Sequence, residues 1–330
     1  MKYLIVTNSP ESNNYAKLLA AELRRYDIRA EIFTNVNGRV EQSNENFEFP
    51  VKSKPIKSKH LKNSGFDLLI VIGETFDKRL VQKVTSRGAF TCFFQLTLNY
   101  KDANSIYQSA LTLFDKVFVD LPIHNPEANS NQIGHFLNDI IRKHHFSENY
   151  SDQLRIGALL SDEKNIGKLK KIIREFQKKS KECQWIVYVN MPTEISKSRF
   201  RSLENVKVVD SELNLLKYAN AVIVDSELDS IAAAFLNCPQ ISISGKYGIF
   251  GFTKTKKPLI NECLKTDIIK NLIPNEHELI VGELSSLLND HEHCASMMAS
   301  YQKFKDKVGT QPVARTAAQM ITEWLEEMES

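Results

Sequence analysis

The stretch at residues 213–245 constrains the fold most strongly, because strand and helix signals alternate there over short distances. Residues 221–224 form an apolar run of strand length, Asp225 and Ser226 make a polar turn, and residues 230–236 predict a helix. A strand, a turn and a helix N-terminus in this order form the place where α/β proteins bind phosphate groups, since unpaired N–H groups point out of the helix start. The stretch therefore predicts a parallel sheet with a candidate phosphate site.

Strand-length apolar runs recur in both halves of the chain, at residues 3–7, 68–72, 116–121, 156–160 and 185–190. Helical patterns separate them, as in the amphipathic segment at residues 166–179. This alternation predicts an α/β fold of the GT-B type, in which two Rossmann-like parallel-sheet domains face each other across a cleft. We assign residues 1–150 and a C-terminal helix at 312–330 to the N-terminal domain, and residues 151–311 to the C-terminal domain.

Composition narrows the class of protein further. The net charge of +3 over 330 residues is too small to favour a nucleic-acid partner. The five cysteines show no paired spacing, which indicates free thiols in a reducing compartment. No apolar run approaches the roughly 18 residues of a membrane span, so we expect a cytoplasmic protein. His291, His293 and Cys294 lack an evident further ligand, and no metal is expected.

Several short motifs occur in an order that is similar to one enzyme family. Residues 116–122 (KVFVDLP) match a family strand that ends in Leu-Pro, residues 133–139 (IGHFLND) match its Val-Gly-His-Pro-Leu-Leu-Asp, and residues 218–221 (YANA) match its Ala-Ala-Asp-Ala. The closing segments at residues 267–273 and 287–290 follow in the family's order. Over most of its length the chain resembles lipid-A-disaccharide synthase, an inverting glycosyltransferase that uses no metal.

The resemblance implies an activity and a set of site residues. The reaction would transfer a diacylglucosaminyl group from a UDP donor to a phosphorylated diacylglucosamine, with the UDP-sugar as substrate and no cofactor. The N-terminal domain would hold the acceptor and the C-terminal domain the nucleotide sugar. Glu74, just after the strand at residues 68–72, is the candidate base, because a carboxylate can deprotonate an acceptor hydroxyl. The donor-site candidates are Ser226, Ser230, His135 and Lys164. For His135 the alternative is a histidine whose ring is satisfied by the backbone.

The chain departs from the family at the turns that face ligands. The turn at residues 8–13 has no glycine, Gly73 stands where the family has its aspartate, and Glu227 replaces a glycine that lets the backbone approach a diphosphate. Glu227 and Asp229 add negative charge, which would repel a phosphate by on the order of a few kcal/mol in a partly shielded site. The alternative is that Asp225, Ser226 and Asp229 form an ordinary helix cap.

Two functions therefore remain open, and the sequence leaves undecided whether the protein is an enzyme. One is the glycosyltransferase that the resemblance implies, with a nucleotide-sugar or sugar-phosphate ligand. The other is a non-catalytic pseudo-glycosyltransferase that keeps the fold for binding or regulation. The lysine-rich residues 51–62 suggest peripheral contact with an anionic membrane surface at the inner membrane. The sequence predicts no oligomeric state.

Overall fold

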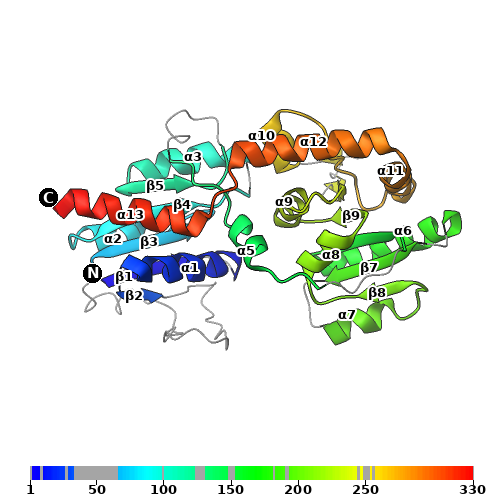
Figure 1. The fold of residues 1–330 in the computed structure, drawn as a ribbon, viewed down its shortest axis with the longest axis horizontal. Coiled ribbons are helices and arrows are strands. Elements are labelled where there is room, and N and C mark those ends of the chain that lie inside the picture. The colour runs from blue at the N-terminus through cyan, green and yellow to red at the C-terminus, as the bar shows by residue number, and fades with distance from the viewer. Residues whose placement is uncertain are drawn as a thin grey trace. The chain divides into compact units, whose positions relative to one another are not determined.

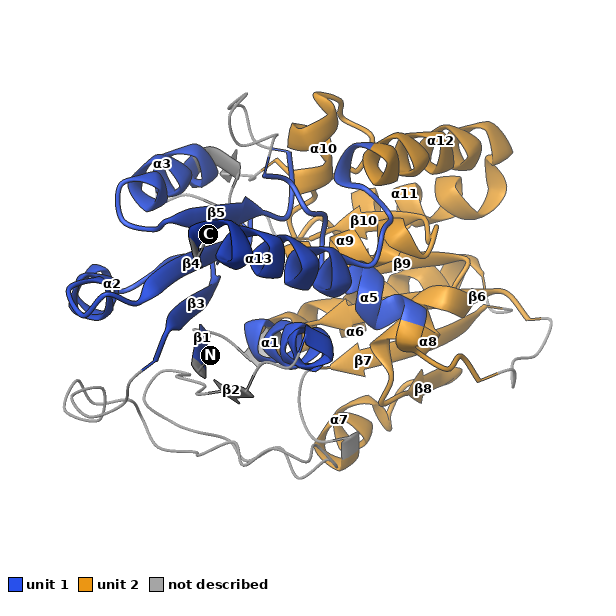
Figure 2. Ribbon diagram, turned by 60° about the vertical axis from the view of Figure 1, so that its left-hand side comes forward, with its two compact units in different colours: residues 1–142, 307–330 blue, residues 143–306 orange. Residues whose placement is uncertain are grey.

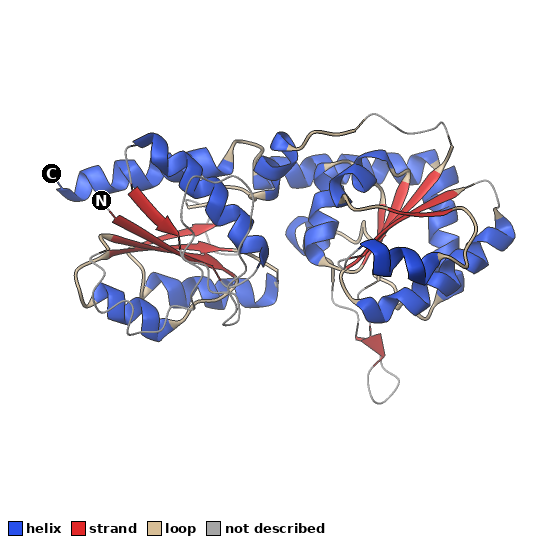
Figure 3. Ribbon diagram, turned by 90° about the horizontal axis from the view of Figure 1, so that it is seen from below, coloured by secondary structure: helices blue, strands red, loops and turns tan. Residues whose placement is uncertain are grey.

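A computed structural model divides the chain into two compact units, residues 1–142 with 307–330 and residues 143–306 (Figure 2). The described residues are 2–7, 10–26, 29–32, 66–98, 100–122, 131–147, 153–180, 183–189, 193–243, 246–247, 253–254 and 257–329. Each unit contains a five-stranded sheet, and helices cover both faces of each sheet (Figure 3). Residues 51–62, for which the sequence suggests membrane contact, lie outside the described residues.

The sheet of the first unit is parallel throughout, with the order β2-β1-β3-β4-β5. Its strands are β1 (Lys2–Thr7), β2 (Arg29–Ile32), β3 (Leu68–Gly73), β4 (Phe90–Gln95) and β5 (Lys116–Val119). Its helices are α1 (Pro10–Leu23), η1 (Arg24–Tyr26), α2 (Lys78–Thr85), α3 (Tyr100–Leu111), α5 (Leu137–Lys143) and α13 (Val313–Glu329). The helix α1 begins at Pro10, so residues 10–13, which the sequence predicts as part of a turn, are helical. Proline suits a first helical turn, where its missing N–H is not needed.

Two apolar layers sandwich this first sheet. Ile70 faces a cluster that includes residues of α1 and α13, which pack against each other (Figure 1). Leu69 and Val71 face a second cluster with residues of α2 and α3. Because successive side chains of a strand point to opposite faces, a strand covered on both sides is apolar at every position. This explains the continuous run that identifies β3 in the sequence, and every residue of that strand is buried.

The sheet of the second unit is also parallel, with the order β10-β9-β6-β7-β8. Its strands are β6 (Arg155–Leu160), β7 (Gln184–Val189), β8 (Val206–Val208), β9 (Ala221–Val224) and β10 (Gln240–Ser242), and β11 (Lys246–Tyr247) and β12 (Thr253–Lys254) form a separate antiparallel pair. Its helices are η3 (Glu163–Asn165), α6 (Ile166–Lys179), α7 (Thr193–Phe200), α8 (Glu212–Tyr218), α9 (Glu227–Phe235), α10 (Leu259–Leu264), α11 (His277–Asn289) and α12 (His291–Val308).

Close packing in the second sheet depends on one glycine. A Cβ on Gly157 of β6 would lie 2.5 Å from a methyl of Leu215 in α8 and 3.1 Å from a methyl of Val222 in β9. On the other face, α6 packs against α11, and the Lys170 ammonium of α6 lies over the Phe200 ring at the end of α7. Right-handed crossovers place α6 and α7 on the face opposite α8 and α9.

Each strand order reverses once, and the reversal locates the expected ligand position of each unit. Chain order turns back between β1 and β3 in the first sheet and between β6 and β9 in the second. In open α/β sheets, ligands bind outside the carboxyl ends of the strands at this switch point. The positions that matter are therefore the residues just after Gly73 in the first unit, and just after Leu160 and Val224 in the second.

Candidate functional site

The turn after β9 is closed by its own side chains. Ser226 is the N-cap of α9, and its Oγ accepts a hydrogen bond from the Asp229 N–H at 3.1 Å. The same hydroxyl donates to the Asp229 carboxylate at 2.6 Å. A hydroxyl has one hydrogen, so Ser226 has none left for a phosphate oxygen in this arrangement. The helix-cap alternative describes this geometry, with Asp229 at the third helical position as in a capping box.

The neighbouring turn after β6 is held by Asp225. Its carboxylate accepts hydrogen bonds from the backbone N–H groups of Ser161 at 2.7 Å and Asp162 at 3.1 Å. It also accepts from the Asn165 side-chain amide at 2.9 Å. Backbone N–H groups at such a turn are the usual donors to a bound anion. Here a carboxylate of the chain occupies two of these donors.

The Asp229 carboxyl group is enclosed by its neighbours, although part of the residue remains exposed. Burial raises its pKa to about 7, and the negative charges of Glu212 and Asp225 act in the same direction, while the hydrogen bond from Ser226 opposes them. Ser161 also donates to this carboxylate through its hydroxyl, at 3.2 Å. Near neutral pH, Asp229 therefore carries a smaller average charge than the sequence suggests.

The Glu227 carboxylate has a hydrogen-bond partner outside this turn. Its carboxylate accepts a hydrogen bond at 3.0 Å from the N–H of Leu259, the first residue of α10. A negative charge at a helix N-terminus is favourable, because the first N–H groups of a helix are unpaired. Glu227 thus ties α9 to α10. Sequence reasoning missed this role because Leu259 lies 32 positions away.

The other donor-site candidates of the second unit lie in different environments. Lys164 belongs to the turn held by Asp225 and is exposed, while its backbone N–H is bonded to the Asp162 carboxylate at 2.9 Å. Ser230 is 1% exposed on the inner side of α9, and its carbonyl accepts from the Gln240 amide at 2.9 Å. The structure therefore brings Ser226 and Lys164 to the two turns of the switch point and leaves Ser230 in the interior.

In the first unit, Glu74 follows the last residue of β3 and is exposed. It stands at the carboxyl end of a strand that pairs with β1, where Thr7 lies opposite Ile72. This is the switch point of the first sheet, where a ligand of this unit is expected. Its position agrees with the role proposed for a base, and that role stays a prediction.

His135 lies in the interior of the first unit, with 1% of its surface exposed. Its Nδ1 accepts a hydrogen bond from the Leu137 N–H at 3.2 Å, and its Nε2 lies 3.5 Å from the Asp120 carboxylate. Burial lowers the pKa of His135 to about 3, so the ring is neutral, and packs edge-on against Tyr15. These contacts favour the backbone-satisfied alternative for this histidine.

Sequence reasoning missed Asp120, the first residue after β5. Both of its carboxylate oxygens accept from the Thr97 N–H, each at 3.0 Å. Burial raises its pKa to about 7, and the hydrogen bonds from Thr97 oppose the shift. Asp120 and Asp225 share one signal: an aspartate placed directly after a buried strand, where it can accept from a neighbouring turn.

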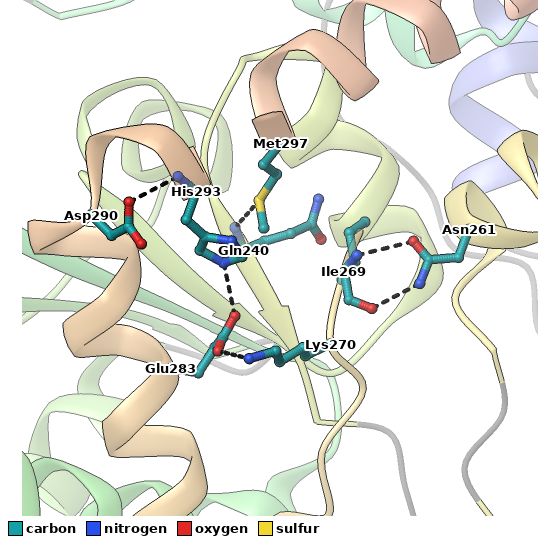
Figure 4. A network of polar contacts seen from close by, with 8 residues as sticks. All are labelled: Gln240, Asn261, Ile269, Lys270, Glu283, Asp290, His293 and Met297. Carbon is teal, nitrogen blue, oxygen red and sulfur yellow. Dashed lines mark hydrogen bonds and ion pairs between the residues drawn. The ribbon is translucent and has the colours of Figure 1, made fainter. Parts of the chain in front are cut away.

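The pair His291 and His293 holds no metal site with Cys294. Instead, the Nε2 of His293 lies 3.0 Å from the Glu283 carboxylate of α11, and the Lys270 ammonium contacts the same carboxylate (Figure 4). Within the described residues, no group of three or more His, Cys, Asp or Glu side chains is arranged to hold a metal ion. No helix in the same part of the chain combines the length and apolarity needed to cross a membrane.

Comparison with solved structures identifies the fold as the GT-B type. A putative UDP-N-acetylglucosamine 2-epimerase from Listeria monocytogenes is similar over 99% of this chain and 97% of its own, with a TM-score of 0.65 and 13% identity. The UDP-GlcNAc 2-epimerase from Methanocaldococcus jannaschii, in complex with UDP-GlcNAc and UDP, covers 98% and 100%, with a TM-score of 0.64 and 14% identity. Glycosyltransferase VinC, in complex with dTDP, covers 99% and 100%, with a TM-score of 0.62 and 11% identity.

The similarity to known proteins is found in the structure and not in the sequence. No protein-family model matches the chain, and no curated protein matches it by sequence. At these identities, the solved structures establish the fold alone. A fold of this kind hosts many functions, which depend on the residues at the two switch points.

Proposed function

We propose that this protein is a pseudo-glycosyltransferase: a GT-B-fold protein that keeps the architecture for binding or regulation and does not transfer sugars. One observation carries the proposal. The carboxylate of Asp225 occupies the backbone N–H groups of Ser161 and Asp162 at the switch point of the second sheet. A nucleoside diphosphate at that point would have to displace an anion that belongs to the chain itself.

The adjoining helix start supports the same conclusion. The Ser226 hydroxyl donates to Asp229, and Glu227 at the first position of α9 places its carboxylate on the N–H of Leu259. A diphosphate brought to this turn would meet the Asp225 carboxylate and the partly ionised carboxyl group of Asp229. Like charges in a partly shielded site repel by on the order of a few kcal/mol, which offsets the one or two hydrogen bonds that a phosphate could gain there.

A second candidate function is the glycosyltransferase that the sequence resemblance implies. The reaction would move a diacylglucosaminyl group from a UDP donor to a phosphorylated diacylglucosamine, with Glu74 as base. The similar structures favour it, because the M. jannaschii epimerase and VinC are solved with UDP-GlcNAc, UDP and dTDP. Ser226 and Lys164 would then reach the donor after Asp229 becomes protonated or the turn rearranges.

Calorimetric titration of the purified protein with UDP and UDP-N-acetylglucosamine separates the two functions. The pseudo-glycosyltransferase proposal expects no heat of binding and no thermal shift at millimolar nucleotide. The M. jannaschii epimerase, titrated in the same buffer, is the positive control. A dissociation constant in the micromolar range for this protein would overturn the proposal.

If binding does occur, one variant tests the second candidate. Glu74→Gln should abolish turnover and leave the dissociation constant for UDP unchanged, because the amide cannot accept the acceptor's proton. Asp77→Asn serves as the control, since Asp77 caps α2 three residues further on. Unchanged turnover in Glu74→Gln would remove Glu74 from the reaction.

A further inference from the structure

The outward face of α6 is strongly basic. The helix carries six basic residues and one acidic residue, while Ile166, Leu169, Ile172, Ile173 and Phe176 form its buried stripe. Lys171, Arg174 and Lys179 are exposed. The apolar stripe packs the helix onto the second unit, so the positive charge gathers on the side that faces solvent.

Most of this charge is not neutralised by the chain itself. Lys178 pairs with Glu175 at 2.7 Å within the helix. Within the described part of the chain, Lys171, Arg174 and Lys179 form no ion pair, and neither does the exposed Lys164 in the turn before α6. A helix that needed only solubility would tend to interleave charges of both signs along its exposed face.

The local field is positive enough to act on the single acid of the helix. The pKa of the Glu175 carboxyl is lowered, first by its hydrogen bond from Lys178 and then by the charges of Lys178, His277 and Lys179. His277 begins α11, the helix that packs beside α6. The start of α11 therefore lies close enough to α6 to act on Glu175.

Two other helices of the second unit, α11 and α7, carry exposed apolar side chains. Leu279 of α11 is 58% exposed, and Ile195 of α7 is 48% exposed. The neighbouring α7 adds Arg199, which contacts Glu163 at 3.6 Å. Lysines and arginines next to exposed aliphatic side chains are typical of surfaces that rest on a lipid bilayer, where the charges meet headgroups and the apolar groups enter the interface.

We propose that the α6 surface, defined by Lys164, Lys171, Arg174 and Lys179, docks on a bilayer that contains anionic phospholipids. Nucleic acid fits this surface less well, because the aromatic rings of this region, Phe176 and Phe200, are buried and unavailable for stacking on bases. The surface lies in the second unit.

The test measures binding of the full-length protein to vesicles of phosphatidylcholine alone and of phosphatidylcholine mixed with phosphatidylglycerol. The protein should sediment with the mixed vesicles and remain in solution with the neutral ones. The triple variant Lys171→Gln/Arg174→Gln/Lys179→Gln should lose about 100-fold in partitioning, since each of the three charges near an anionic surface contributes about fivefold. Salt should weaken binding of the wild type more than that of the variant.

A matched variant removes the same number and type of charges elsewhere. Lys78→Gln/Arg79→Gln/Lys303→Gln changes exposed residues of α2 and α12 and should bind as the wild type does. Equal losses in the two variants would refute a docking role for α6, as would sedimentation that ignores phosphatidylglycerol. Tighter binding to a single-stranded oligonucleotide than to mixed vesicles would assign the surface to nucleic acid instead. Self-association that the α6 triple variant abolishes, without vesicle binding, would assign it to a second copy of the chain.

Discussion

Replacing Asp225 by alanine should destabilise the second unit by about 2–3 kcal/mol. The carboxylate accepts three hydrogen bonds, from Ser161, Asp162 and Asn165, at 2.7 to 3.1 Å. A hydrogen bond to a charged group contributes about 1.5–3 kcal/mol when shielded from solvent. Two of these bonds are exposed to solvent, so we assign about 1 kcal/mol to each bond.

Urea unfolding followed by tryptophan fluorescence can measure this loss in one unit. The chain has two tryptophans, Trp185 in β7 and Trp324 in α13. In a Trp324→Phe background, the buried Trp185 reports on the second unit alone. Asp210→Ala is the control, because Asp210 is an exposed aspartate outside the turn, and its loss should cost less than about 0.5 kcal/mol.

The same variant tests why the switch point rejects anions. Without the carboxylate, the N–H groups of Ser161 and Asp162 become available, and phosphate should restore part of the lost stability to Asp225→Ala but not to Asp210→Ala. A cost of Asp225→Ala within about 0.5 kcal/mol of the control would refute the claim that this carboxylate holds the turn. Equal responses of both variants to phosphate would refute the claim that it blocks an anion site.

Three further predictions concern packing and charge. Asp229→Asn should make the stability of the second unit less dependent on pH, because a carboxyl group whose pKa rises on folding to about 7 stabilises the fold less as the pH increases from about 4 to 7. The urea midpoints of the variant and the wild type should therefore diverge across that pH range, with the variant relatively more stable at pH 8. Parallel curves of midpoint against pH would contradict this. Gly157→Ala should lower the free energy of unfolding by about 1–3 kcal/mol, because its Cβ would lie 2.5 Å from a methyl of Leu215. The control Gly167→Ala in α6 meets open space and should raise the free energy of unfolding by up to about 1 kcal/mol. Equal melting temperatures of the two variants would contradict the packing argument. Glu283→Gln should lower the free energy of unfolding by about 1–3 kcal/mol, since the amide cannot form ion pairs with Lys270 and His293. In the same urea unfolding assay, Glu278→Gln, at an exposed position of the same helix, should have almost no effect. Equal urea midpoints of the two variants would contradict the prediction.

The strands and helices followed from the sequence because their causes are local. The helix α6 spans Ile166–Lys179, the range predicted from its apolar stripe, and β9 spans the predicted residues Ala221–Val224. Both signals arise within a few residues, from a 3.6-residue period and from a strand buried on both faces. The turn predicted at residues 8–13 overlaps α1, because a stretch rich in asparagine and serine conceals the helix that begins at Pro10.

The candidate site was predictable only in part. The sequence offered a phosphate site or a helix cap for Ser226 and Asp229, and both readings use the same residue types. The choice between the two depends on the partner of the Ser226 hydroxyl. The fold places this hydroxyl 2.6 Å from the Asp229 carboxylate, to which it donates. The buried state of His135 was also undecided, because its neighbour Asp120 lies at the end of another strand.

The sequence by itself determined the alternation of strands and helices, the GT-B fold class and the acidic residues that follow β9. Only the tertiary structure decided what those residues do. Asp225 reaches a turn 60 to 64 residues away, and Glu227 reaches a helix 32 residues away. Such contacts depend on strand order and register, which bring the carboxyl ends of β6 and β9 together. Local patterns encode periodicity and burial but not which distant N–H group a carboxylate will meet.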